Sequence, residues 1–183
     1  MTGDGRGIVL VGYRGTGKTT VGRILAERTR RPFLDLDREV EARAGKSIPA
    51  IFTEDGEPAF RDLESRVVLD LADRAAGSVV ATGGGAILAE ANRKALRAFG
   101  FVAWLAADVE TLARRLRSSR RGVDDRPALT SAGTIAEIAE VLEARLPLYR
   151  EAADAEVDAS QGPDRVADAV LEAWSRFAPE VAR

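Results

Sequence analysis

The chain has 183 residues, of which 45% are hydrophobic and 31% charged, and we expect residues 1–183 to form one globular domain. It contains no cysteine and no histidine, which excludes disulfides, zinc sites and catalysis by a thiolate or an imidazole base. The formal net charge of −2, from 27 basic and 29 acidic residues, argues against electrostatic binding of nucleic acid by the chain as a whole.

The apolar segments of the chain are short. The longest, such as residues 8–11 and 101–107, fall far below the roughly 20 residues that span a bilayer, so we expect no membrane partner. The first residues do not combine a basic start with a long apolar segment, so we expect no secretory signal and a cytoplasmic protein. No heptad seam stands out, and the expected state is a monomer.

Apolar segments alternate with helical patterns along the chain, which is typical of β-α-β units and a parallel sheet. We expect strands at residues 8–11, 33–36, 78–82, 102–105 and 155–157. Helices are expected at residues 18–29, 38–44, 57–75, 89–99, 109–118, 135–149 and 164–177. Their apolar residues recur every three or four positions, which indicates faces that pack in a core. The prediction is an α/β fold, a three-layer α/β/α sandwich with a five-stranded parallel sheet.

The first expected strand leads into Gly-Tyr-Arg-Gly-Thr-Gly-Lys-Thr at residues 12–19, which matches the phosphate-binding P-loop G-x-x-x-x-G-K-[ST]. Its glycines let backbone N–H groups turn toward phosphate oxygens, and the helix that follows adds its positive dipole. Lys18 is expected to reach the β- and γ-phosphates, and Thr19 to offer its hydroxyl to Mg²⁺. The remaining ATP contacts expected from this loop are Gly15, Thr16, Gly17 and Thr20.

A P-loop alone leaves kinases, GTPase switches, ATPase motors and inactive nucleotide-binding modules open. Two acids, Asp35 and Asp37, follow the second expected strand, and alternation along an extended strand would point both to the same side, beside the P-loop. One could organise Mg²⁺ through water, and the other could orient or deprotonate an attacking hydroxyl. The alternative is that Asp37 only caps a helix beginning at Arg38.

The third expected strand runs into Gly83, Gly84 and Gly85, where an ordinary switch or motor would carry a metal-linked aspartate. The absence of a carboxylate there argues against those two classes.

Residues 118–133 form a polar, turn-rich segment between two expected helices that is too long for a simple connection. It is either a mobile lid or a plain surface loop. A local positive patch accompanies it, made of Arg114, Arg115, Arg117, Arg120 and Arg121. Asp124, Asp125 and the scarcity of aromatic residues argue against a nucleic-acid role and favour phosphate steering.

In combination these motifs resemble the shikimate kinase family. The likeness rests on the P-loop, Asp35-Leu36-Asp37, Ile51-Phe52 followed by Gly56-Glu57-Pro58-Ala59-Phe60-Arg61 with Glu64, Thr82-Gly83-Gly84-Gly85, and Arg126-Pro127-Ala128-Leu129 followed by Arg145-Leu146-Pro147-Leu148-Tyr149. It extends from about Ile8 to Leu171. The resemblance implies a P-loop fold like that of nucleoside monophosphate kinases. It also implies transfer of the γ-phosphoryl group of MgATP to the 3-hydroxyl of shikimate, in chorismate and aromatic amino acid biosynthesis.

The resemblance implies that helices within about residues 37–75 bind shikimate. Asp37 would hold its hydroxyls, and Asp35 would lie near Mg²⁺ and contact it through water. Arg61 and Arg145 would grip its carboxylate, for which two guanidinium groups are well suited. The other shikimate contacts that the resemblance implies are Phe52, Phe60, Gly83, Gly84 and Gly85.

The resemblance also makes residues 118–133 the lid of the family, with Arg126 folding over the phosphates. Arg126 would then act in catalysis together with Lys18 and Asp37. Arg115 would pack against adenine, and Gln161 would lie in the adenine-binding loop. The tail after about Arg176 has no counterpart to which a role can be assigned.

Two other interpretations are weighed against this one. The first is another kinase of the same scaffold, acting on gluconate or a nucleoside monophosphate, but such sites lack the glycine run paired with an arginine such as Arg61 after Gly-Glu. The second is a non-catalytic nucleotide-dependent module, which would require the acid pair or the arginine clamp to be broken. Both are intact here.

Overall fold

The computed structural model describes residues 6–71, 76–118 and 135–180. The elements follow in the order β1 (Gly7–Val11), α1 (Lys18–Thr29), β2 (Phe33–Asp35), α2 (Leu36–Ala44), α3 (Ile48–Glu54), α4 (Gly56–Leu69), β3 (Val79–Ala81), α6 (Glu90–Phe99), β4 (Gly100–Ala106), α7 (Val109–Ser118), α9 (Ile135–Ala152), β5 (Ala155–Asp158) and α10 (Pro163–Glu180). Within these described ranges, no helix combines the length and the apolar character that a bilayer span requires.

The strands form one five-stranded sheet in the order β2-β3-β1-β4-β5, and every neighbouring pair is parallel. The predicted five-stranded parallel sheet is therefore confirmed. Because the strands are parallel, their carboxyl ends share one edge of the sheet. The order brings the segments after β2, β3 and β1 side by side at that edge, although they are far apart in the sequence.

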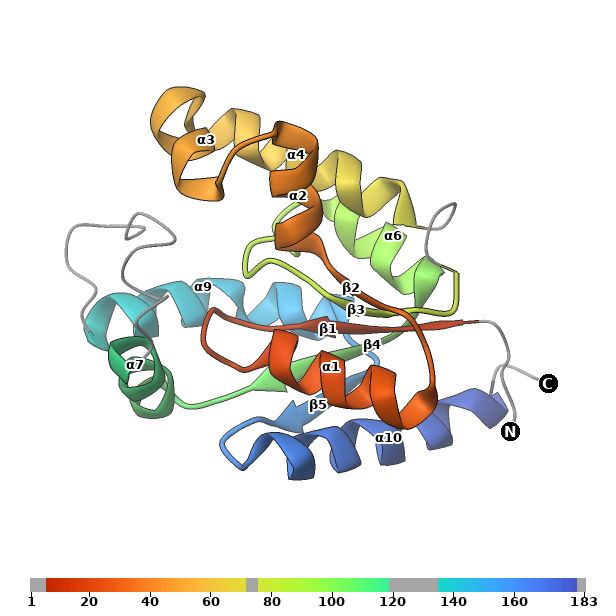
Figure 1. Ribbon diagram of the computed structural model, residues 1–183. Coiled ribbons are helices and arrows are strands. Elements are labelled where there is room, and N and C mark those ends of the chain that lie inside the picture. Colours follow the sequence, from red (N-terminus) through yellow and green to blue (C-terminus); the bar gives the residue numbers. More distant parts are fainter. Residues whose placement is uncertain (1–5, 72–75, 119–134, 181–183) are drawn as a thin grey trace.

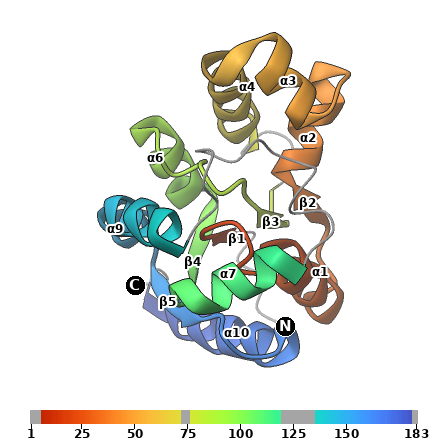
Figure 2. The ribbon, with the colours of Figure 1, turned by 90° about the vertical axis from the view of Figure 1, so that its left-hand side faces the viewer.

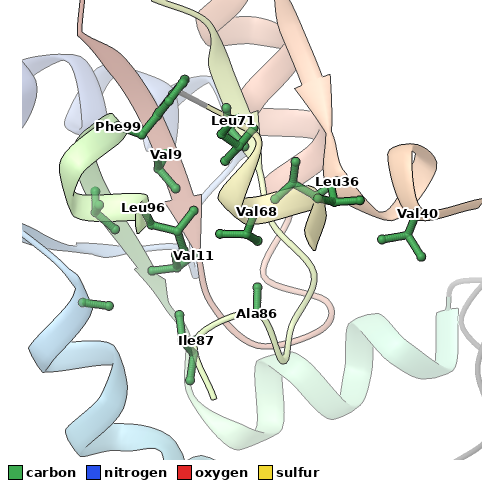
Figure 3. Close-up of a cluster of buried hydrophobic side chains, with 14 of the residues drawn as sticks. Val9, Val11, Leu36, Val40, Val68, Leu71, Ala86, Ile87, Leu96 and Phe99 are labelled. Carbon is green, nitrogen blue, oxygen red and sulfur yellow. The ribbon is translucent and has the colours of Figure 1, made fainter. Parts of the chain in front are cut away.

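Alternate residues of β1 face opposite sides of the sheet, as the period of two in a strand requires. Ile8 and Leu10 pack in a core with residues of α1 and α10, whereas Val9 and Val11 pack in a second core with residues of α2, α3, α4, α6 and α9. Figure 1 shows α1 and α10 below the sheet and α2, α4 and α6 above it. Figure 3 shows part of the upper core around Val9 and Val11. The predicted three-layer sandwich is confirmed.

The start of α2 differs from the prediction. β2 ends at Asp35 and the helix begins at Leu36, so the expected strand is one residue too long and the expected helix begins two residues too late. Asp35 is the N-cap, because its Oδ1 accepts a hydrogen bond of 3.1 Å from the backbone N–H of Asp37. Asp37 is thus not the cap, and strand alternation does not relate the two acids.

The sequence did not predict α3 or the end of α4. α3 is a helix of seven residues, too short for an apolar period, although its start is marked by Ser47 as N-cap and by Pro49 in the first turn. The helix expected over residues 57–75 ends earlier, since α4 stops at Leu69 and Asp70 follows as its C-cap. Residues 72–75 lie outside the described residues, and so do all but the first of residues 118–133.

Candidate active site

The loop between β1 and α1 has the form of a phosphate cradle. α1 begins at Lys18, as predicted, and its N-cap is Gly17. Gly15 and Gly17 have φ angles of +87° and +93°, in the left-handed region that side chains disfavour. The Oγ1 of Thr16 donates to the carbonyl of Tyr13 at 2.9 Å and closes the turn. These features fix the loop that the P-loop pattern predicts.

Lys18 lies within this cradle. Its side chain is buried, and its Nζ donates to the carbonyl oxygens of Gly12 at 2.8 Å and Tyr13 at 2.9 Å. The ammonium group is thus held at the loop by neutral acceptors, which an anionic phosphate oxygen can replace with a stronger, charge-assisted hydrogen bond.

Thr19 and Asp35 are in direct contact at the carboxyl edge of the sheet. The Oγ1 of Thr19 donates to Oδ2 of Asp35 at 2.8 Å, so the two side chains of the expected magnesium site lie together. Hydroxyl and carboxylate oxygens are the hard ligands that Mg²⁺ prefers. No cluster of three or more acidic or other metal-ligating side chains occurs in the described part of the chain. This sparse donor set fits an ion that takes its remaining ligands from substrate phosphates and water.

Two carboxylates converge on Gly83, two residues after the end of β3. A Cβ atom built at Gly83 would lie 2.6 Å from Oε1 of Glu64 and 2.8 Å from Oδ1 of Asp37. Any side chain at this position would displace one of the two acids. The turn into α2 therefore brings Asp37 to the glycine run, where the resemblance implies that both contact shikimate, although strand alternation does not place it there.

Arg61 on α4 is held by two acids of its own helix. Its Nη1 donates to Oε2 of Glu64 at 2.8 Å, and its Nε and Nη2 donate to Oε1 of Glu57 at 3.2 and 3.1 Å. Only 4% of the Glu64 side chain is exposed, so this ion pair is screened little by solvent. The guanidinium group is thereby fixed in one direction before any ligand binds.

An aromatic pair lies next to Arg61, formed by Phe52 of α3 and Phe60 of α4. The rings of Phe52 and Phe60 lie 4.7 Å apart, and the Arg61 guanidinium carbon lies 5.1 Å from the centre of the Phe60 ring. Arg61 also reaches the glycine run, because a Cβ atom at Gly85 would collide with its Nη1. The predicted contacts Phe52, Phe60, Arg61 and Gly85 thus lie together.

Arg145 on α9 reaches the glycine run from another helix. Its Nη1 donates to the carbonyl of Gly84 at 3.1 Å, and its guanidinium carbon lies 6.0 Å from the ring centre of Tyr13 in the P-loop. Burial raises the pKa of Tyr13, and the nearby charges of Arg14 and Arg145 oppose this shift. The two predicted arginines therefore contact neighbouring glycines, Arg145 at Gly84 and Arg61 at Gly85.

Arg115 joins the P-loop to the segment after β5. Its Nη1 donates to the carbonyl of Gly15 at 3.5 Å, and its Nη2 donates to the carbonyls of Ser160 and Gln161, both at 3.3 Å. Arg115 and Gln161 are thus brought together at the P-loop. Arg126 and the expected lid around it lie outside the described residues.

Figure 2 looks toward the end of the molecule where α7 lies, and shows how these parts are arranged. The red P-loop lies between α7 on one side and the helices α2, α3 and α4 on the other. The first side carries Arg115, and the second carries Arg61 and the aromatic pair. Arg115 and the Arg61 cluster therefore lie on opposite sides of the P-loop.

The sequence analysis assigned no role to Glu64 or Tyr149, although both lie within the motifs on which the family resemblance rests. Glu64 is three residues from Arg61, and Tyr149 is four residues from Arg145. Residues at these spacings share one face of a helix, so the spacing was an available signal that each arginine has a partner.

A sequence model of the shikimate kinase family matches residues 14–175. The curated shikimate kinase of Pseudomonas syringae pv. tomato is 43% identical over 173 residues, covering 94% of this chain and 96% of that protein. The shikimate kinase of Ruegeria pomeroyi is 48% identical over 164 residues, covering 87% of this chain and 82% of that protein.

Solved structures agree with these relatives. A shikimate kinase from Acinetobacter baumannii in complex with shikimate matches with a TM-score of 0.85 and 38% identity, covering 97% of this chain and 96% of that one. A gluconokinase from Sinorhizobium meliloti matches with a TM-score of 0.55 and 18% identity, covering 97% of this chain and 96% of that one, a likeness of fold alone. The chain has the P-loop kinase fold of these neighbours.

Proposed function

The chain belongs to the shikimate kinase family, and from this premise we propose that the site around its P-loop carries out the reaction of the family. The γ-phosphoryl group of ATP is transferred to the 3-hydroxyl of shikimate, which gives shikimate 3-phosphate and ADP. The observation that carries the proposal is that Arg61 and Arg145, from two different helices, contact the glycine run beside the P-loop.

Arg61 and Arg145 bind the carboxylate of shikimate. Their guanidinium groups carry charge at every working pH and present planar pairs of donors that match a carboxylate. Glu57 and Glu64 hold Arg61 in place beforehand, so little side-chain freedom is lost when shikimate binds. Phe52, Phe60 and the glycine run supply the surface against which the ring rests.

Asp37 orients the 3-hydroxyl toward the γ-phosphoryl group and accepts its proton. The chain has no histidine, so a carboxylate is the natural base, and Asp37 follows the strand next to the glycine run. Lys18, together with Arg126 from the proposed lid over residues 118–133, offsets the charge that develops on the transferred group. Catalysis in this scheme is mainly positioning and charge neutralisation.

Thr19 and Asp35 are the residues that would hold Mg²⁺, Thr19 directly and Asp35 through water. A bound Mg²⁺ would supply positive charge that offsets part of the negative charge of the phosphates. The phosphates are held by Gly15, Thr16, Gly17, Lys18, Thr19 and Thr20. Arg115 and Gln161 contact the adenine base, which is supported by the hydrogen bond between them beside the P-loop.

The partners are shikimate and ATP, with no nucleic acid or membrane partner. Members of the family are cytoplasmic, and we propose the same compartment for this chain. We also propose that residues 1–183 form one domain and that the protein is a monomer. The slight negative net charge of −2 supports the absence of a nucleic-acid partner.

The proposed substrate is tested by ADP release from purified protein and MgATP with shikimate, gluconate, AMP or no acceptor. We expect release that depends on shikimate alone, because the arginine pair selects a carboxylate on a compact ring. The gluconate reaction matters because a gluconokinase shares the fold at 18% identity. Release driven by AMP instead would keep the P-loop assignment and overturn the carboxylate clamp, whereas release driven by gluconate, which also carries a carboxylate, would overturn shikimate as the substrate.

Gly85→Ala is expected to weaken shikimate binding by about tenfold or more while the protein remains folded, since small displacements of a binding group are costly. The added methyl group meets the end of the flexible Arg61 side chain, so the guanidinium moves while the backbone stays. Shikimate titration without nucleotide measures the effect, and thermal unfolding checks the fold. Gly162→Ala is the matched control, because a Cβ atom there meets nothing within 4 Å. Normal shikimate affinity in Gly85→Ala would show that Arg61 need not hold its position.

A further inference from the structure

The carbonyl oxygen of Gly84 accepts hydrogen bonds from two side chains of α9. Arg145 Nη1 donates to it at 3.1 Å, and the Tyr149 hydroxyl donates to it at 3.3 Å. The Tyr149 side chain is fully buried, and its ring stacks on Trp104 with a centroid distance of 5.4 Å and an interplanar angle of 6°. The stacking on Trp104 therefore holds the Tyr149 ring in place, with its hydroxyl directed at the Gly84 carbonyl.

Tyr149 keeps its proton under all ordinary conditions. Burial raises the pKa of its hydroxyl to about 12, and the neighbouring Arg145 guanidinium opposes this shift. The phenol is therefore a permanent hydrogen-bond donor to Gly84 at neutral pH.

The two donors have different tasks once shikimate is present. In the substrate-free protein Nη1 of Arg145 donates to the Gly84 carbonyl, and the inference takes the guanidinium to turn from Gly84 to the shikimate carboxylate when the substrate binds. A buried carbonyl left without a donor costs free energy, and this cost would weaken the affinity for shikimate. Tyr149 cannot turn away, because its ring is locked between α9 and β4.

We propose that Tyr149 is a positioning residue for shikimate binding, whose hydroxyl keeps the Gly84 carbonyl paired and the Gly84-Gly85 peptide fixed while Arg145 moves to the substrate. The peptide unit is planar, so fixing the carbonyl of Gly84 also fixes the direction of the Gly85 N–H. This inference rests on the proposed function, because it needs Arg145 to bind the shikimate carboxylate.

The test is Tyr149→Phe, which keeps the ring and its stacking and removes only the hydroxyl. We expect the Kd for shikimate to rise about five- to fiftyfold, which is the cost of a buried unpaired carbonyl. The Kd for ATP and the melting temperature of the substrate-free protein should stay at wild-type values, because Arg145 still donates to Gly84 in that state. Thr29→Val is the control, since it removes a hydroxyl that donates to the Leu25 carbonyl on α1.

A second readout needs no substrate. In an Arg145→Met background Gly84 has already lost one of these donors, so adding Tyr149→Phe removes the other. We expect the melting temperature of the Arg145→Met protein to fall by about 3–8 °C on this addition, against no change in the wild-type background. A simple packing role would give equal shifts in both backgrounds.

Three results would overturn the inference. Unchanged shikimate affinity in Tyr149→Phe, with normal wild-type binding, would overturn it and leave the proposed function standing. Equal thermal shifts in the two backgrounds, or an equal loss of affinity for ATP, would assign Tyr149 a structural role only. Absence of shikimate binding by the wild-type protein would contradict the proposed function itself.

Discussion

Lys18→Ala is expected to lower kcat by about 10²–10³-fold, the usual loss when a donor that stabilises transition-state charge is removed. Lys18 is buried in the cradle formed by residues 12–19, and in the proposed complex its ammonium group contacts the phosphates directly. The loop itself is closed by the Thr16 bond and by its glycines, so circular dichroism should report a folded protein. Steady-state kinetics with saturating shikimate measures the effect.

Lys94→Ala is the matched control for Lys18→Ala. It removes the same charge from an exposed side chain on α6 that pairs with Glu90 one helical turn away. Its kcat should equal that of the wild type. A Lys18→Ala protein that retained more than a tenth of wild-type kcat would contradict the assigned role.

Arg145→Ala is expected to raise the Kd for shikimate about a hundredfold, because truncating one partner of a charge pair commonly costs about 2–5 kcal/mol. The Kd for ATP should change little, since Arg145 contacts Gly84 on the acceptor side of the site. Arg61→Ala should weaken shikimate binding similarly. It should also lower the melting temperature, because the buried Glu64 carboxylate loses this ion pair.

The controls for the two arginines lie on the same helices. Arg66→Ala on α4 removes an exposed guanidinium that pairs with Asp62, and Arg150→Ala on α9 removes another exposed one. Both should bind shikimate as the wild type does. Unchanged shikimate affinity in both Arg61→Ala and Arg145→Ala would contradict the assignment of these two arginines to the shikimate carboxylate.

The fold and the nucleotide half of the site were largely predictable because their signals are local. Alternation of apolar and helical patterns indicated the parallel sheet, and the P-loop pattern placed the start of α1 at Lys18, where the structure has it. The position of Asp35 beside the P-loop, where it contacts Thr19, also followed from the expectation that the carboxyl ends of parallel strands face one crevice.

The remaining features depend on packing between distant segments. The turn from β2 into α2 is set by the Asp35 cap, which competes with continuation of the strand and overrides simple alternation. The convergence of Glu64 and Asp37 on Gly83, and of Arg145 and Tyr149 on Gly84, depends on how α4 and α9 lie against the sheet. No pattern within α4 or α9 encodes these distances. The lid and Arg126 stay predictions.

Identification of the product by ³¹P and ¹H NMR is the most direct test of the proposed reaction. Wild-type protein, MgATP and shikimate should give one phosphate monoester for each ADP, with its phosphorus coupled to the proton on C3 of the ring. Inorganic phosphate accumulating beside unmodified shikimate, or coupling to the proton of a different ring carbon, would contradict transfer to the 3-hydroxyl.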